Sequence, residues 1–270
     1  ISWIGSRTSS FEPEPQRPAR FLIMASPARF HAPDAGAPGQ QAILRGEEHH
    51  HLSRVLRLKP GDPLSLFDGK GRAFSARLVS VGRRESIAQV IGEETAGVES
   101  ALALSLAVAL SKGEKLDWVL QKGTELGVHA FHLIPARRSD LRLPAERVPE
   151  RLARWQRLAL EACKQSGRNR IPEVHSPEPL ESFLAGPLPP LRIVLEPGSE
   201  NSLRELGMDP ASHGGVVVAT GPEGGWEPEE IDAFRAARFV PCRLGPRTLR
   251  CETAAIAAAA LLQHLAGDLR

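Results

Sequence analysis

The sequence predicts a mixed α/β protein in two parts, a small β-barrel or sandwich followed by a larger α/β domain with a parallel sheet. In the first part, short strand-like segments recur about every ten residues and are separated by Gly and Asp turns. In the second part, apolar strand-like runs alternate with helical stretches, the pattern of strands joined by crossover helices. The chain of 270 residues, 41% of them hydrophobic, has room for two modest domains.

An N-terminal extension precedes the first part. Residues 1–23 are rich in Ser, Pro, Glu and Arg, lack the apolar segment of a secretory signal, and lead to Met24, which looks like the natural start. We therefore predict a non-native or disordered extension at 1–23, a barrel domain at 24–97 and an α/β domain at 98–270. The barrel elements are predicted as strands 41–44, 63–67, 73–81 and 86–91 and one helix over 47–56, before a linker over 92–100.

Strand-like and helical segments alternate beyond the linker. The run 101–110 is apolar almost throughout, which indicates a buried strand. Residues 147–165 predict an amphipathic helix, because Leu152, Trp155 and Ala159 share one stripe while arginines share another. The remaining elements are predicted as strands 128–135, 191–195, 215–220 and 239–244, and as helices 114–126, 228–237 and 253–266.

Positive charge is concentrated in one stretch, although the whole chain carries only +2. The stretch 137–170 holds ten Lys or Arg against four Asp or Glu, a surplus of six. A basic stretch of this kind favours RNA contact, with steep loss of binding as salt rises. An arginine-studded helix face that is merely solvated is the alternative. The predicted RNA-binding residues are Arg54, Arg57, Arg137, Arg138, Arg168 and Arg170.

Cysteine, histidine and hydropathy patterns limit the class of protein. Three cysteines form an odd number without metal-ligand spacing, which favours a reduced, cytoplasmic protein. The consecutive histidines 49–51 cannot share one helix face, so we predict no metal site. No run approaches the roughly 18 apolar residues of a membrane span, so we predict no membrane partner.

Two glycine-rich loops near the C-terminus carry the strongest functional signal. The loop 221–225 (GPEGG) follows a predicted strand, as does the loop 245–254, and open α/β sheets bind ligands at paired strand ends. The first loop matches no phosphate-binding fingerprint, Pro222 lacks an N–H donor, and Glu223 would repel a phosphate. A cationic or zwitterionic ligand such as S-adenosylmethionine fits better. The alternative is a tight turn that needs Gly for backbone reasons alone.

The second loop places charged residues before a helix. Capping explains Thr253 and Glu252, but arginines are disfavoured at a helix N-terminus. We therefore interpret Arg250 or Arg247 as a binder of an anionic or electron-rich group, or else as part of an inter-subunit salt bridge. Cys251 is interpreted as a packing or capping residue, and a cysteine nucleophile is the alternative.

A resemblance to a known family rests on a series of motifs in order. On the N-terminal side these are 29–31 (RFH), His51, 55–57 (VLR), 61–62 (GD) and 66–69 (LFDG). On the C-terminal side they are 112–115 (KGEK), 121–127 (QKGTELG), 161–168 (EACKQSGR), 221–225 (GPEGG) and 244–250 (LGPRTLR). Over about residues 28–268, the chain resembles the RsmE family, 16S ribosomal RNA uridine N3-methyltransferases of the SPOUT superfamily.

The resemblance implies a PUA-like β-barrel that binds RNA, followed by a SPOUT α/β domain whose C-terminal part threads a trefoil knot. It implies a homodimer, and knot loops that hold S-adenosylmethionine in a bent shape. By this similarity the cofactor-binding residues are Leu195, Glu196, Pro197, Gly221, Glu223, Gly224, Leu244, Gly245, Thr248, Leu249 and Arg250.

The implied reaction is methylation of N3 of a specific uridine, of the U1498 type in the decoding region, in 16S rRNA of the assembled small ribosomal subunit. Neutral uracil carries a proton on N3, so the enzyme must help to remove it or stabilise the resulting anion. We expect Arg250 to stabilise that anion and Glu223 or Glu252 to accept the proton. The alternatives are another SPOUT enzyme, such as a ribose 2′-O-methyltransferase, and a non-catalytic RNA-binding module.

Overall fold

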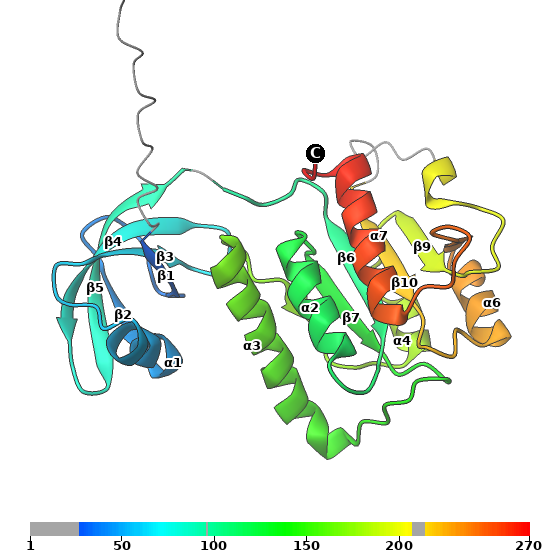
Figure 1. Ribbon diagram of the computed structural model, residues 1–270, viewed down its shortest axis with the longest axis horizontal. Helices are drawn as coiled ribbons and strands as arrows, with labels where there is room; N and C mark the ends of the chain where they lie inside the picture. The colour runs from blue at the N-terminus through cyan, green and yellow to red at the C-terminus, as the bar shows by residue number, and fades with distance from the viewer. Residues whose placement is uncertain (1–26, 96, 207–213) are drawn as a thin grey trace, which may run out of the picture.

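The computed structural model describes residues 27–95, 97–206 and 214–270, which form two lobes (Figure 1). The extension predicted at 1–23, and Met24 as the start, lie outside the described residues. The N-terminal lobe is a curled sheet and the C-terminal lobe is an α/β domain, so the predicted α/β class is confirmed.

The N-terminal sheet contains five strands in the order β1-β3-β4-β5-β2. Its predicted strands are all present, and β2 shows why, since its residues alternate between exposed and buried. The sequence analysis missed β1, which has only four residues and pairs in parallel with β3. The elements of this lobe are β1 (Ala28–His31), β2 (Gln41–Arg45), α1 (Gly46–His50), a π-helical turn (His51–Val55), β3 (Pro63–Phe67), β4 (Ala73–Val81) and β5 (Glu85–Glu94).

The C-terminal sheet is parallel throughout its described pairings, with the order β11-β9-β10-β6-β7-β8. The sequence analysis missed the two-residue β8 and the six-residue α4, which are too short to show a period. The strands are β6 (Leu104–Ala109), β7 (Ala130–Ile134), β8 (Glu173–Val174), β9 (Leu191–Leu195), β10 (Val216–Thr220) and β11 (Val240–Cys242). The helices are α2 (Lys115–Glu125), α3 (Val148–Ser166), α4 (Leu180–Ala185), α6 (Pro228–Ala236) and α7 (Cys251–Ala266), with 3-10 turns at Ala145–Arg147 and Leu203–Leu206.

Helices cover both faces of the C-terminal sheet (Figure 1). One apolar core joins the sheet to α2, α3 and α7 and includes Leu120, Trp155 and Leu262. A second core joins the opposite face to α4 and α6 and includes Phe183 and Phe234. The central strand β10 is buried at every position, as a strand between two helical layers must be. Within the described ranges, no helix is both long and apolar enough to cross a membrane.

The two lobes are joined by the loop that follows α3. Its backbone forms isolated β-bridges between Arg170 and the Gly69–Lys70 turn of the N-terminal lobe. Lys164 of α3 also pairs with Glu48 of α1 at 2.9 Å, and both side chains are largely buried. The barrel lobe is therefore anchored to the helix that carries much of the basic stretch.

Candidate active site

A cavity of about 700 Å³ lies at the carboxyl ends of β9 and β10, beside the N-terminus of α7. This is the edge at which parallel sheets bind ligands, and the volume is within the range of small-molecule sites. Three segments far apart in the sequence form its wall. The lining residues are Leu195, Glu196, Pro197, Thr220, Gly221, Pro222, Glu223, Gly225, Trp226, Ile231, Thr248, Leu249, Arg250, Cys251 and Ala254.

The structure brings most of the predicted cofactor-binding residues to this cavity. All the predicted positions line it except Gly224, Leu244 and Gly245, which belong to the same two loops. The two glycine-rich loops therefore share one cavity. The predicted contacts of individual residues with a cofactor stay predictions.

Backbone requirements explain the glycines of the first loop. Gly225 adopts φ +71°, a left-handed conformation that favours glycine. A Cβ on Gly221 would lie 3.1 Å from Nε1 of Trp226, so the indole packs directly on the backbone at this point. The loop is thus a tight turn and also part of a cavity wall, and the two interpretations of its glycines are compatible.

Glu223 lines the cavity and forms an ion pair with Lys115, the first residue of α2. The hydrogen bond with Glu223 raises the pKa of Lys115. The role of Lys115 was not predictable from the sequence, because 108 residues separate the partners and no local pattern relates them.

Glu196 faces a second cation. Its Oε2 lies 3.6 Å from Nη2 of Arg235 on α6, and Glu196 lines the cavity. The cavity wall therefore carries two carboxylates, each with a cationic neighbour, and Arg250 at the mouth. A wall that carries charges of both signs suits a zwitterionic ligand more than a phosphate.

Arg250 occupies the N-cap position of α7, exposed and in extended conformation. Because the helix already begins at Cys251, Glu252 and Thr253 lie inside its first turn, and the prediction that they cap it is wrong. Among the described residues, no carboxylate lies within ion-pair distance of Arg250, so its guanidinium is available to a ligand. Glu252 lies outside the cavity and lines a groove between α2 and α7.

Cys251 lines the cavity but is a poor nucleophile. Burial and a hydrogen bond to Glu252 raise the pKa of its thiol to about 11. A thiol that keeps its proton near neutral pH reacts slowly, because the thiolate is the nucleophilic form. The geometry therefore favours the packing role over the cysteine-nucleophile alternative.

Two buried polar groups of the cavity wall have no hydrogen-bond partner among the described residues. They are Oγ1 of Thr220 and Nε1 of Trp226. Unpaired buried donors and acceptors are rare in folded proteins, and in a cavity wall a bound ligand can supply the missing partner. Together with the two carboxylates and the glycine-rich backbone, they fit a zwitterionic ligand that carries hydrogen-bonding groups. Among the described residues, no group of three side chains is placed to hold a metal ion.

The predicted RNA-binding arginines differ in their surroundings. Arg54, Arg57 and Arg170 are exposed. Arg137 and Arg138 are also exposed but pair with Glu229 and Glu227 of the α6 region. These two arginines therefore contact the start of α6 and the residue before it as well as solvent.

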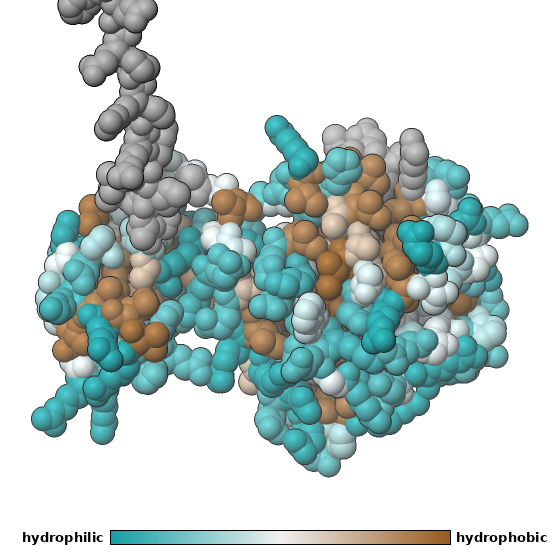
Figure 2. Space-filling view, viewed as in Figure 1, coloured by the Kyte–Doolittle hydropathy of each residue, from teal (hydrophilic) through white to brown (hydrophobic). Residues whose placement is uncertain are grey.

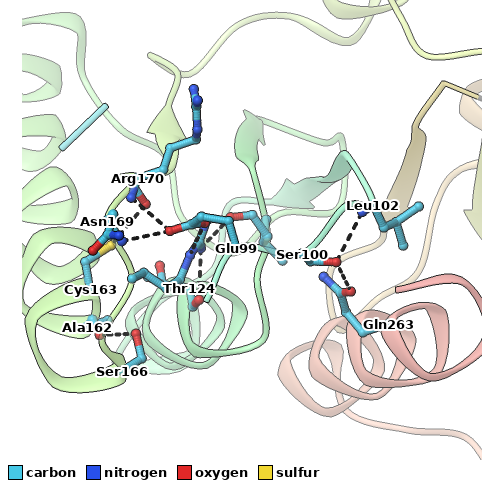
Figure 3. Close-up of polar contacts among 12 residues, drawn as sticks. Glu99, Ser100, Leu102, Thr124, Ala162, Cys163, Ser166, Asn169, Arg170 and Gln263 are labelled. Carbon is cyan, nitrogen blue, oxygen red and sulfur yellow. Dashed lines mark hydrogen bonds and ion pairs between the residues drawn. The ribbon is translucent and has the colours of Figure 1, made fainter. Parts of the chain in front are cut away.

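Arg168 is buried, and the prediction that it binds RNA is wrong. Its side chain is 3% exposed and donates to Oε2 of Glu99 at 3.0 and 2.9 Å. Its Nη1 donates to the carbonyls of Thr124 and Val128. Figure 3 shows Glu99 beside Thr124, Asn169 and Arg170. The backbone N–H groups of Asn169 and Arg170 also donate to the Glu99 carboxylate. The guanidinium of Arg168 is therefore bound within the protein and does not face a ligand.

Comparisons with protein families match both lobes. Residues 98–263 match the RNA methyltransferase domain, and residues 44–91 match the RNA methyltransferase PUA domain.

Three similar proteins share one description. Ribosomal RNA small subunit methyltransferase E of Bacillus subtilis is 31% identical over 84% of this chain and 91% of its own length. The Synechocystis protein of that description is 34% identical over 80% of this chain and 70% of its own length. The crystal structure of ribosomal RNA small subunit methyltransferase E from Neisseria gonorrhoeae, bound to S-adenosyl methionine, superposes with a TM-score of 0.83 at 35% identity, covering 90% of this chain and 100% of that one.

Proposed function

The chain belongs to the ribosomal RNA small subunit methyltransferase E family, and on this premise we propose that it methylates N3 of the U1498-type uridine in 16S rRNA with S-adenosylmethionine as methyl donor. Membership of this family makes the protein a methyltransferase that acts on rRNA of the small ribosomal subunit. The uridine that it methylates and the methylated atom, N3, are what we propose. The single observation that supports it most is the cavity at the ends of β9 and β10, which is lined by both Glu223 and Arg250. We assign RNA binding to 24–97 and methyl transfer to 98–270.

The cavity residues would hold the cofactor in the following way. The loops around Leu195, Gly221 and Leu249 offer backbone groups and apolar surface, which suit an adenosine moiety. Glu196 and Glu223 place negative charge in the wall, which favours a sulfonium. When bound, S-adenosylmethionine supplies an electrophilic methyl group on positively charged sulfur.

The protein's own residues prepare the uracil. The N3–CH₃ bond forms as the S–CH₃ bond breaks, and the proton of N3 must leave before or during that step. Arg250 stabilises the negative charge that spreads over O2 and O4 of the base, since preorganised charge near a developing anion lowers the barrier. Glu223 lies in the cavity and accepts the proton directly or through water. Glu252 is the second candidate, but its place in the α2–α7 groove supports it less.

RNA contact is proposed for the exposed arginines on both lobes, namely Arg54, Arg57, Arg137 and Arg170. The contacts that anchor the barrel lobe to α3 support this RNA contact, because they hold the arginines of one lobe in a fixed position relative to those of the other. Each phosphate contact releases counterions, so affinity for small subunits should fall at least about tenfold between 50 and 200 mM salt. Filter binding over a salt series measures this, and a flat profile would exclude the basic surface.

A homodimer, a knot and a cytoplasmic location complete the proposal. The groove between α2 and α7 is lined by Trp118, which is 54% exposed, and by Ile256 and Ala260. Figure 2 shows apolar surface over α7, where Leu261 and Leu265 are exposed. A second copy would bury this surface.

The convergence of three loops on one cavity supports a trefoil knot in the C-terminal lobe. Three free cysteines fit a location in the cytoplasm, where thiols stay reduced.

Methyl uptake tests the proposal. The purified protein is incubated with radiolabelled S-adenosylmethionine and with small subunits, free 16S rRNA or large subunits from a strain without this modification. Incorporation into small subunits, with less into free rRNA and none into large subunits, is the expected result. Incorporation into large subunits alone, or none at all, would contradict it.

A further inference from the structure

An arginine from a separate loop holds the 221–227 segment, defined here as the cofactor loop. Arg138 follows β7. Its Nε donates to Oε1 of Glu227 and its Nη2 donates to Oε2, both at 2.8 Å. Its Nη1 donates at 2.9 Å to the carbonyl oxygen of Gly224. Three donors of one guanidinium are thus directed at two points of the cofactor loop.

The side-chain stem of Arg138 also covers the loop. A Cβ on Gly224 would lie 3.1 Å from Cβ of Arg138 and 3.3 Å from its Cδ. Since Cβ of Arg138 cannot move without its backbone, a side chain at position 224 would push the two loops apart. Gly224 is therefore needed for this close approach and not for a left-handed turn, because its φ is not positive.

A buried carboxylate fixes the base of the same contact. Glu230 is 5% exposed, and its Oε1 accepts from the backbone N–H of Arg137 at 2.9 Å. Its Oε2 accepts from the backbone N–H of Glu227 at 2.8 Å. Glu230 therefore fixes the backbone at Arg137 relative to the backbone at Glu227. Arg138 adds a second contact between the same two segments at the surface.

We propose that Arg138 is a positioning residue that holds the cofactor loop in the shape that binds S-adenosylmethionine. The inference rests on the proposed function and differs from the RNA contact that the sequence predicts for this residue. Gly221, Glu223 and Trp226 line the cavity, and Arg138 holds the loop at residues 224 and 227, on either side of Trp226. A planar fork is required, because a lysine ammonium cannot bind both oxygens of Glu227 and the Gly224 carbonyl together.

Calorimetric titration with S-adenosylmethionine, in the absence of RNA, separates this role from RNA binding. Arg138→Gln and Arg138→Lys are both expected to weaken binding about tenfold, the effect of losing a charge-assisted contact that shapes the site. Unchanged cofactor affinity in both variants, with weaker binding to small subunits that lysine restores, would assign Arg138 to RNA and overturn the proposal. A wild-type protein that does not bind the cofactor would instead contradict the proposed function.

A double-mutant cycle with Glu227→Gln tests whether the pair acts as one unit. The double variant Arg138→Gln/Glu227→Gln should bind no more weakly than Arg138→Gln, because the loss of Arg138 already removes its contact with Glu227. Losses that multiply would overturn the proposal. Arg45→Gln is the matched control, since it breaks the exposed Arg45–Glu85 pair of the barrel and should leave cofactor affinity unchanged. Circular dichroism melts verify that every variant is folded.

Discussion

In the proposed mechanism, Arg250 is the residue on which the chemistry depends most. It lines the cavity, it is exposed, and the described structure offers it no carboxylate partner. Arg250→Ala should lower single-turnover methylation by about 10²–10³-fold, the usual cost of removing a group that stabilises a developing anion. Rapid-quench assays with saturating cofactor measure the rate. Arg247→Ala is the control, because Arg247 lies in the same loop but outside the cavity lining; equal rates for wild type and Arg250→Ala would exclude Arg250 from the mechanism.

His132 predicts an acid sensitivity that is unrelated to catalysis. Burial lowers its pKa to about 4, and the neighbouring His175 ring, stacked at 4.4 Å, adds to the effect. The folded state thus binds a proton less readily than the unfolded state, whose histidine titrates near 6.5. Stability should therefore fall as the pH decreases from about 6.5 to 4, by roughly 3 kcal/mol, and this contribution should level off below pH 4.

The variant His132→Phe keeps an aromatic ring but removes the titration. Urea unfolding at several pH values should show a flatter dependence for this variant between pH 6.5 and 4. His50→Gln, at an exposed position of α1, serves as the control and should retain the wild-type slope. An unchanged slope for His132→Phe would show that another group causes the acid sensitivity.

Helix α2 illustrates how packing overrides propensity. Alanine favours helices over glycine by about 1 kcal/mol, so propensity alone predicts that Gly123→Ala stabilises the protein. A Cβ on Gly123, however, would lie 2.8 Å from two ring carbons of Phe131, which is fully buried in β7. We expect a net destabilisation of about 1–2 kcal/mol, because the ring has no room to move. Thermal melts measure it, and a raised melting temperature would contradict the packing argument.

Long elements were predictable from the sequence and short ones were not. The predicted strands 63–67, 73–81 and 191–195 agree with β3, β4 and β9 residue for residue, because each shows alternation or an apolar run bounded by turns. The four-residue β1 shows no such pattern, because this segment is a strand only through its pairing with β3. Helix α7 starts two residues before the predicted start, since Arg250 and not Glu252 precedes its first turn.

Contacts between distant segments were beyond sequence reasoning. The glycine-rich loops carried enough chemistry to predict a shared ligand site. The ion pairs of Glu223 with Lys115 and of Glu227 with Arg138 span 108 and 89 residues, and only the folded sheet brings them together. The basic stretch misled the prediction at Arg168 because total charge does not reveal which arginine is buried.

At the scale of the whole molecule, Glu99 joins the linker to the loop that holds both lobes. Its carboxylate accepts from the Arg168 side chain and from two backbone N–H groups. Glu99→Ala would leave the buried guanidinium without its counter-charge, so we expect a loss of about 3 kcal/mol in the free energy of unfolding. Urea denaturation measures this loss. Glu85→Ala, which removes an exposed ion pair, should cost less than about 1 kcal/mol, and similar losses for both variants would contradict the assigned role of Glu99.

The identity of the methylated nucleoside is the most direct test of whether the protein methylates N3 of a uridine in 16S rRNA. Small subunits from a strain without the modification are treated with the purified protein and S-adenosylmethionine, and 16S rRNA nucleosides are analysed by mass spectrometry before and after treatment. We expect N3-methyluridine to appear at the single U1498-type position with the wild-type protein and to be lost with the Arg250→Ala variant. A 2′-O-methylated ribose, or no new methyl group on a uracil, would contradict it.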